Sequence, residues 1–328
     1  MALSALARAF VNRYQGGFPI AEARPFDCLA ASLGSTGDAV LGLIKTLLDS
    51  GYLSRFGPIY DASRLGGGQT LAALNVPEER FAAVAGQVNA LPEVAHNYRR
   101  EHALNMWFVV AASSPAGVAA TLQEIERTTG LQVYDFPKQH EFYLGLWLAL
   151  DEQGGVDTVP VPLDRGTSPR PLDEVDYRII AATQSGLPLV EKPVEELGGR
   201  LGLSPQEVVA RLEGMLDSGA IRRIGAVPNH YRLGLRGNGM TVWDVPDELA
   251  VELGERVGAL DFVSHSYLRP RHPGVWPYNL FAMVHGRGRA EVLEKVGRVA
   301  EVLDPHCRAR DVLFSSEVLK KTGLRLAA

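Results

Sequence analysis

The chain has 328 residues, of which 46% are apolar and 22% are charged, and its formal net charge is −5. This composition is that of a soluble globular protein with room for about two domains, and it excludes disordered, collagen-like and coiled-coil chains. The negative charge offers no overall field that would attract nucleic acid. Two cysteines suit a reducing cytosol, and no apolar run reaches the ~20 residues of a membrane helix. We therefore expect a cytoplasmic protein with no membrane contact.

An internal duplication organises the chain. Leu48–Gly51 recurs as Leu216–Gly219, and the motif His96-x-Tyr98 recurs as His265-x-Tyr267. Proline and glycine are dense between the copies, which favours a linker over a helix. In chain order we expect a helix-turn-helix over 1–68, an αβ domain over 69–150, a linker over 151–171, a second helix-turn-helix over 172–236 and a second αβ domain over 237–328.

Each copy repeats the same predicted elements. Three short helices come first, and in copy two Ser204-Pro205 starts the third helix while Gly219 ends it. Residues 220–227 are predicted to be an arm of a wing hairpin. A βαββαβ order follows, with strands near 70–76, 94–99, 105–111 and 132–136 in copy one and near 239–245, 263–268, 279–284 and 310–314 in copy two. The fold class is thus α+β, a tandem duplication of winged helix-turn-helix and ferredoxin-like units.

The helices that would read DNA are acidic. Residues 204–219 hold three acids against Arg211, and residues 35–51 hold two acids against Lys45. Phosphates would be repelled by both helices. We therefore expect that the helix-turn-helix units serve packing or dimerisation and that no nucleic acid is bound.

Histidine, tyrosine and arginine gather on the middle strands of each βαββαβ unit. Alternate residues of a strand share a face, so His96 lies beside Tyr98, and His265 lies beside Tyr267 and Arg269. A single strand histidine is most often an ordinary surface residue, but a pair at matched positions favours a site. Another cluster, Arg222, Arg223, His230 and Tyr231, follows the second helix-turn-helix, whereas copy one has Asp61-Ala62 in place of Asn229-His230. His140 and His306 lack a partner motif, and His285 lies at a predicted strand end beside Gly286, so we expect no role for these three.

These residue types suit a planar polyanion. Histidine donates protons near neutral pH, arginine binds carboxylates in a forked geometry, and aromatic rings stack on flat ligands. Neutral histidine can also ligate iron. The chain has no glycine-rich phosphate loop before a helix and no metalloprotease motif.

Several long motifs resemble those of the siroheme decarboxylases, Lrp/AsnC-like proteins of d1-type heme biosynthesis. They are His96-Asn-Tyr-Arg-Arg-Glu-His102, Arg222-Arg-Ile-Gly-Ala-Val-Pro-Asn-His-Tyr231, Gly237-Asn-Gly-Met-Thr-Val-Trp-Asp-Val-Pro246 and Trp276-Pro-Tyr-Asn-Leu-Phe-Ala-Met-Val-His-Gly286. The resemblance covers nearly the whole chain and implies the fused form of two partner subunits. It implies removal of carbon dioxide from two acetate side chains of siroheme, giving didecarboxysiroheme, without an organic cofactor and with essential histidines.

Carried over by motif, the resemblance assigns roles to individual residues. Catalytic candidates are His96, His102 and His265. Substrate-binding candidates, chiefly for the carboxylates, are Arg99, Arg100, Arg222, Arg223, His230, Tyr231, Arg269, Arg271 and His272. His230 or His265 is a candidate axial ligand of the substrate iron, and no metal of the protein's own is expected.

Copy two departs from the pattern, because five extra residues and Pro270 displace His272 from the position of His102. Expected partners are siroheme and either a second copy of the chain or partner decarboxylase subunits. Two alternatives stay open at this point: a heme- or siroheme-responsive transcriptional regulator, and a regulatory subunit that needs a partner chain.

Overall fold

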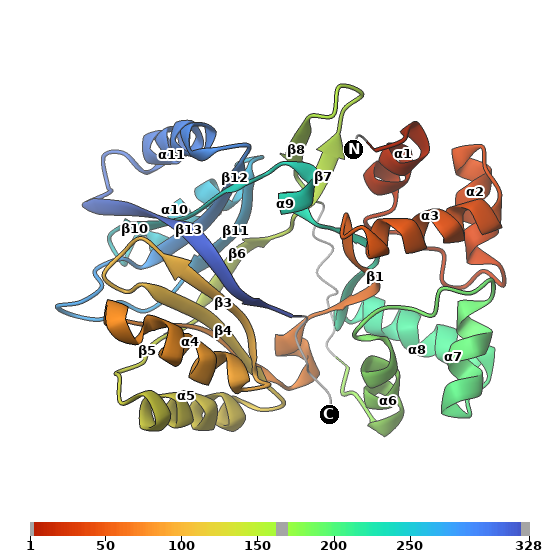
Figure 1. Ribbon diagram of the computed structural model, residues 1–328, viewed down its shortest axis with the longest axis horizontal. Coiled ribbons are helices and arrows are strands. Elements are labelled where there is room, and N and C mark those ends of the chain that lie inside the picture. The colour runs from red at the N-terminus through yellow and green to blue at the C-terminus, as the bar shows by residue number, and fades with distance from the viewer. Residues whose placement is uncertain (1–2, 162–169, 323–328) are drawn as a thin grey trace.

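The computed structural model describes residues 3–161 and 170–322, and it separates a helical part from a part built on a large sheet (Figure 1). The helical part holds both helix-turn-helix units. Copy one contributes α1 (Ala5–Arg13), α2 (Pro25–Leu33) and α3 (Gly37–Asp49), and copy two contributes α6 (Glu174–Thr183), α7 (Pro193–Leu201) and α8 (Pro205–Asp217). The Ser204 side chain caps α8 by accepting from the Glu207 amide, as the sequence predicts.

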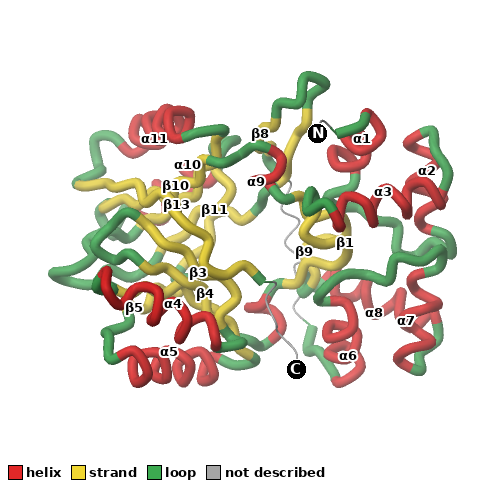
Figure 2. The backbone as a smooth tube through the Cα atoms, viewed as in Figure 1, coloured by secondary structure: helices red, strands yellow, loops and turns green. Residues whose placement is uncertain are grey.

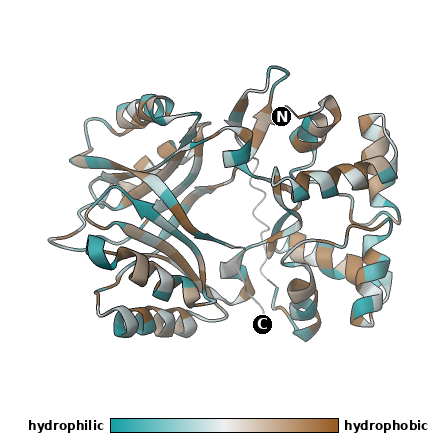
Figure 3. Ribbon diagram, viewed as in Figure 1, coloured by the Kyte–Doolittle hydropathy of each residue, from teal (hydrophilic) through white to brown (hydrophobic). Residues whose placement is uncertain are grey.

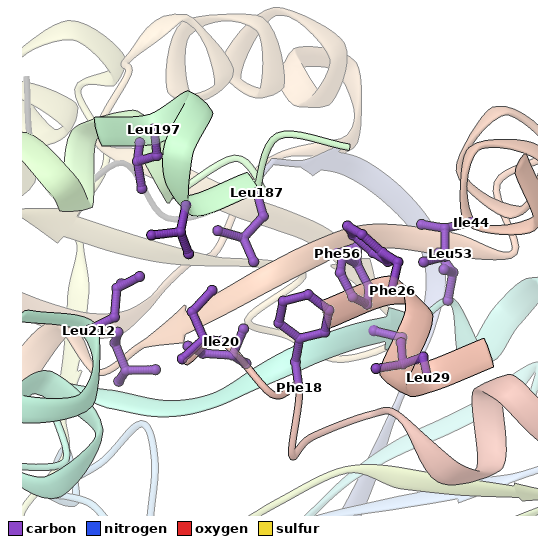
Figure 4. Packing of buried hydrophobic residues seen from close by; sticks show 14 of the residues in the cluster. Phe18, Ile20, Phe26, Leu29, Ile44, Leu53, Phe56, Leu187, Leu197 and Leu212 are labelled. Carbon is purple, nitrogen blue, oxygen red and sulfur yellow. The ribbon is translucent and has the colours of Figure 1, made fainter. Parts of the chain in front are cut away.

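The two helix-turn-helix units share one hydrophobic core. Phe18, Phe26 and Phe56 of copy one pack in the same cluster as Leu187 and Leu212 of copy two (Figure 4). Because each short helix buries its apolar face in this joint core, neither unit is packed independently of the other.

The predicted wing hairpins do not form. The wing strands are β1 (Leu53–Tyr60) in copy one and β9 (Ile221–Pro228) in copy two. They pair with each other in an antiparallel ribbon (Figure 2). Gly57 lies opposite its repeat equivalent Gly225, so a pseudo-twofold axis relating the copies passes between them. The wing strands therefore join the copies, a role that local sequence does not encode.

A close backbone approach near this axis makes a testable prediction. A Cβ atom on Gly225 would lie 2.6 Å from the carbonyl oxygen of Tyr14, where the backbone cannot yield easily. We expect Gly225→Ala to lower the free energy of unfolding by about 1–3 kcal/mol, the usual cost of overpacking. Gly42→Ala is the control, because Gly42 lies in α3 with open space around it and gains helix propensity. Urea denaturation of both variants measures the contrast, and equal midpoints would contradict it.

The sheet of the described residues has nine strands in the order β5-β2-β4-β3-β13-β10-β12-β11-β6. Its two end strands, β5 (Tyr134–Pro137) and β6 (His140–Leu144), follow each other directly in the chain. The amide of Gln139, between them, donates to the carbonyl of Leu268. The sheet therefore closes into a barrel. Its other strands are β2 (Gly68–Leu74), β3 (Val94–Arg100), β4 (Met106–Ala112), β10 (Gly237–Asp244), β11 (Val263–Leu268), β12 (Leu280–Gly286) and β13 (Ala309–Lys321).

The copies exchange strands within this barrel. The first part of β13 pairs with β10 of its own copy, and the part from Ser315 to Lys321 pairs with β3 of copy one. In the same way β5 pairs with β2 of its own copy, whereas β6 pairs with β11 of copy two. The last predicted strand, 310–314, is thus part of a longer strand that reaches the other copy.

Helices cover the outside of the barrel. They are α4 (Phe81–Ala90) and α5 (Pro115–Thr129) in copy one, and α10 (Ala250–Gly258) and α11 (Arg289–Leu303) in copy two. Their ribbons change between hydrophilic and hydrophobic along the chain, as amphipathic helices do (Figure 3). Inside the barrel, Trp107, Phe136, Trp276 and Phe281 form a separate aromatic core. The barrel interior is therefore filled by rings where these four residues meet.

The expected linker contains regular structure. Strand β8 (Val156–Val159) lies within it and forms a hairpin with β7 (Trp147–Leu150), which precedes it. Gln15, just past the end of α1, holds this hairpin through two hydrogen bonds with the backbone of Leu148, of 2.8 and 2.9 Å. Residues 162–169 of the predicted linker lie outside the described residues. Within the described ranges, no helix is long and apolar enough to cross a membrane.

Candidate functional site

Strand β3 directs His96, Tyr98 and Arg100 toward the barrel interior. Tyr98 lies opposite the buried Trp107, and its ring stacks parallel to that of His96 with centroids 6.1 Å apart. Alternation turns Arg99 to the outer face, where its guanidinium pairs with Glu78 at 2.6 Å and covers the Phe81 ring. The structure therefore groups Arg100 with His96 and places Arg99 outside that group.

Strand β11 and the residue that follows it repeat this arrangement with His265, Tyr267 and Arg269. The Arg269 guanidinium lies 4.9 Å from the Tyr267 ring centre, and that of Arg100 lies 5.7 Å from the Tyr98 ring centre. Each arginine donates from Nη1 to a backbone carbonyl, Arg100 to Leu313 of the neighbouring β13 and Arg269 to Phe136 of β5. The repeat in the sequence is thus a repeat in the site.

Arg100 is a buried cation without a counter-ion in the described part of the chain. Its side chain is 7% exposed, its Nε has no hydrogen-bond partner, and it forms no ion pair with any described residue. Burial lowers the pKa of its guanidinium to about 10, and burial lowers that of Arg269 to about 10 as well. An unpaired buried charge is costly in an apolar interior, so this arrangement favours an anionic ligand.

The short helix α9 (His230–Leu233) brings two more rings to this group. Asn229 caps α9, and Gly234, with φ of 117°, ends it. The rings of His230 and Tyr231 lie 4.3 Å apart, and the Lys321 ammonium lies 4.9 Å from the Tyr231 ring centre. Lys321 is also the ladder partner of His96. Copy two therefore completes a cationic, aromatic group around His96 of copy one.

His285, for which the sequence predicts no role, lies at the centre of the histidine group. Its ring is 5.0 Å from that of His230, and its Nε2 is 2.7 Å from the Ser264 hydroxyl. The same hydroxyl is 2.7 Å from Nδ1 of His265. Comparison of the copies missed His285 because copy one has no histidine to match it. Its place in the motif Trp276–Gly286 is the signal that could have identified it.

All four histidines are held neutral. Burial lowers the pKa of His96 to about 4, of His230 to about 3 and of His265 to about 4. Burial also holds the pKa of His285 well below 6.5, with His230, His265 and Lys321 adding repulsion. Carboxylates of a bound ligand would act in the opposite direction and raise these pKa values.

The neutral His285 predicts a pH dependence of stability. Because its folded-state pKa lies below the unfolded value, the unfolded chain binds more protons, and stability is lost as the pH falls below about 6.5. We expect the free energy of unfolding to fall between about pH 6 and pH 5 more steeply in the wild type than in His285→Gln. The expected difference is about 1 kcal/mol per pH unit. Urea denaturation at both pH values measures the slopes, and parallel slopes would contradict the assignment.

The side of the barrel near His265 carries its own acids. Arg222 pairs with Asp61 at 2.6 Å and with Glu141 at 3.2 Å, and Lys138 pairs with Glu141 at 2.6 Å. Arg222 is therefore partly neutralised. Its neighbour Arg223 donates to the carbonyl of Ala226, and no contact with the histidine group is found for it among the described residues.

Three other candidates lie at the far, aromatic end of the barrel. His102 packs edge-on against Trp276 and lies 3.9 Å from Asp311, ten residues along β13 from Lys321. His272 contacts the Phe136 ring and the carbonyl of Asp135. Arg271 pairs with Asp244 and Asp247. The structure does not bring these three together with His96 and His265.

Two further observations bear on the chemistry. Within the described part of the chain, no group of three or more histidine, cysteine, aspartate or glutamate side chains is arranged to hold a metal ion. In α8, Arg211 is bound by Asp173 at 2.5 Å and by Asp176 at 3.3 Å. The cation that could contact a DNA phosphate from α8 is therefore already paired.

Comparisons with known proteins agree with this architecture. The model of the AsnC-like ligand binding domain matches residues 64–143 and 232–320, and that of the siroheme decarboxylase NirDL-like HTH domain matches 7–53 and 176–222. The siroheme decarboxylase NirDL subunit of Paracoccus denitrificans is 32% identical over 327 residues, covering 100% of this chain and 99% of that protein.

Shorter relatives match half of the chain. The siroheme decarboxylase NirH subunit of Paracoccus pantotrophus is 57% identical over 154 residues, covering 47% of this chain and 96% of that protein. A crystal structure of siroheme decarboxylase NirDL in complex with an iron-uroporphyrin III analogue superposes with a TM-score of 0.69 at 28% identity, covering 97% of this chain and 92% of that one. With its duplicated domains and a full-length relative at this identity, the chain belongs to the siroheme decarboxylase family.

Proposed function

We propose that the chain is a siroheme decarboxylase, which removes carbon dioxide from two acetate side chains of siroheme and gives didecarboxysiroheme. The observation that carries the proposal is the pair of inward arginines, Arg100 and Arg269, beside four neutral histidines. The names of the relatives and the iron-uroporphyrin analogue bound by a solved NirDL structure support the same substrate class.

The arginines fix the substrate by its carboxylates. Arg100 has no competing acid among the described residues, so a carboxylate gains a charge-assisted hydrogen bond there without displacing one. The flat macrocycle can lie against Tyr98, Tyr231 and Tyr267, which line the same interior. Binding by its outer carboxylates orients the acetate that reacts.

Decarboxylation breaks the bond between the methylene carbon and the carboxylate carbon. Carbon dioxide leaves, the electron pair stays on the methylene carbon, and the conjugated macrocycle spreads the charge, so we propose that no organic cofactor is required. A proton then converts the methylene into a methyl group, one proton for each carbon dioxide lost. We assign this proton to His96, because ligand carboxylates would raise its low pKa and the interior limits access of water.

Assembly and location are part of the proposal. The NirH and NirDL relatives are named as subunits, which favours either partner decarboxylase subunits or a second copy of this chain. Both cysteines, Cys28 and Cys307, are free thiols, which suits the cytoplasm.

Anaerobic incubation of the purified protein with siroheme, followed by mass spectrometry of the tetrapyrrole, tests the proposal. We expect the loss of two carbon dioxide masses. Unchanged siroheme, together with salt-sensitive retention of DNA in a gel shift, would instead support the regulator.

A further inference from the structure

We infer that Ser264 and His285 are positioning residues that hold His265 as the tautomer with its proton on Nδ1 and its lone pair on Nε2. The neutral His265 then offers an electron pair to the barrel interior rather than a proton. The hydrogen-bond geometry carries this inference, and only its consequence for catalysis rests on the proposed function.

A β-bulge places the serine for this contact. The register of β11 against β12 shifts between Val263 and His265, so Ser264 is the extra residue of the bulge. A regular strand would turn Ser264 away from His265, whereas here its Oγ is 2.7 Å from Nδ1 of His265 and 2.7 Å from Nε2 of His285. The hydroxyl thus links two imidazole rings.

The direction of the protons follows from Asn238. Its amide nitrogen faces the carbonyls of Leu235 and Arg236, at 3.5 and 3.3 Å, which leaves its Oδ1 toward Nδ1 of His285. An amide oxygen only accepts, so Nδ1 of His285 carries a proton and its Nε2 is an acceptor. The Ser264 hydroxyl donates to this Nε2 at 2.7 Å rather than to the Met283 carbonyl, which lies 3.4 Å away. The Ser264 oxygen must then accept from Nδ1 of His265. The lone pair of neutral His265 therefore lies on Nε2.

Within the described residues, copy one has no such chain of hydrogen bonds. Gln69 pairs with Ala111 in its sheet where Asn238 pairs with His285 in copy two, and Ala95 precedes His96 as Ser264 precedes His265. Among the described residues, the hydrogen-bond contact found for Nδ1 of His96 is the Tyr98 hydroxyl, at 3.4 Å. Hydrogen bonds therefore fix the tautomer of His265 but not that of His96.

This difference gives His96 and His265 different roles. His96 is free to take either tautomer and to donate once a ligand raises its pKa. His265 presents an electron-pair donor, which can bind the iron at the centre of the substrate or receive a hydrogen bond from its rim. A histidine that ligates iron commonly donates its other ring N–H to a protein acceptor, as Ser264 accepts here.

Nitrogen-15 NMR of the full chain labelled at histidine tests the tautomer directly. His265→Gln identifies the signals of His265. We expect Nδ1 of His265 to be protonated in the wild type and in Ser264→Thr, and Ser264→Ala to shift the ring toward the other tautomer. Ser266→Ala is the matched control, because Ser266 is a buried serine of the same strand whose hydroxyl has no partner among the described residues. A His265 signal protonated on Nε2 in the wild type, or unchanged in Ser264→Ala, would overturn the inference.

Two functional measurements accompany the NMR. We expect Ser264→Ala to lower kcat by about tenfold to a hundredfold, a typical loss for a partner of a ligating histidine, with Ser266→Ala near the wild type. Binding of iron-uroporphyrin and of metal-free uroporphyrin then separates the two sources of the contact. If Ser264→Ala loses affinity only for iron-uroporphyrin, the group that His265 contacts is the iron. If it loses affinity equally for both porphyrins, the group is a donor on the rim of the macrocycle. If siroheme is not turned over at all, the proposed function fails while the NMR result still decides the tautomer.

Discussion

Replacement of His96 by alanine is expected to lower the rate of siroheme decarboxylation by a factor of about 10² to 10⁴, the usual contribution of a general acid. The methylene carbon left by departing carbon dioxide needs a proton, and His96 lies on the inner face of β3 beside Tyr98 and Lys321. Because His96 is not an ion-pair partner of any described residue, substrate affinity should change by only a few-fold. Single-turnover assays with siroheme under anaerobic conditions separate the two effects.

His306→Ala is the control for this variant, since His306 is exposed and lies outside the barrel strands. It should decarboxylate siroheme at the wild-type rate. A His96→Ala enzyme that also kept the wild-type rate would remove His96 from the mechanism and transfer the proton donor to another histidine of the group.

Arg100→Ala is expected to act on binding. A charge-assisted hydrogen bond is worth about 1.5–3 kcal/mol, so the dissociation constant for iron-uroporphyrin should rise by about 10- to 100-fold. The alanine also leaves the carbonyl of Leu313 without its donor, and a thermal melt must show that the variant is folded. Arg100→Lys keeps the positive charge but loses the forked donor geometry of the guanidinium. Its affinity should fall between those of the wild type and the alanine variant.

Arg99→Ala is the neighbouring control. Its guanidinium points outward to Glu78, so affinity for the tetrapyrrole should stay within about twofold, the scale of a surface ion pair. Equal losses of affinity in the Arg99 and Arg100 variants would show that the ligand is not bound on the inner face of β3.

The fold was largely predictable because its signals are local or repeated. The Ser204 cap, the apolar spacing of the helices and the βαββαβ order all reflect short stretches of sequence. The partners of β9 and β13 were not predictable in this way, because a strand edge accepts any complementary edge. The wing of each copy therefore pairs with the other copy, and β13 continues to Lys321 only because β3 of copy one is there to receive it.

The site was predictable where the copies agree and obscure where they differ. Matched motifs found His96 and His265, and strand alternation explains why Arg100 and not Arg99 joins them. His102 was grouped with His96 by its spacing, but β3 ends at Arg100 and the chain turns there, with the His102 amide donating to the carbonyl of Arg100. His285 escaped notice because it has no counterpart in copy one.

The exchange of strands between the copies has an evolutionary consequence. Two separate chains that donated β6 and β13 to each other would already form this barrel, so joining them end to end demands no new surface. The covalent link fixes the ratio of the two copies at one to one and keeps each copy at a high effective concentration near the other. Each copy then always meets the same neighbour. A histidine gained at position 230 in one copy need not be gained at position 62 in the other, and an ancestral symmetric pair is free to become an asymmetric catalyst.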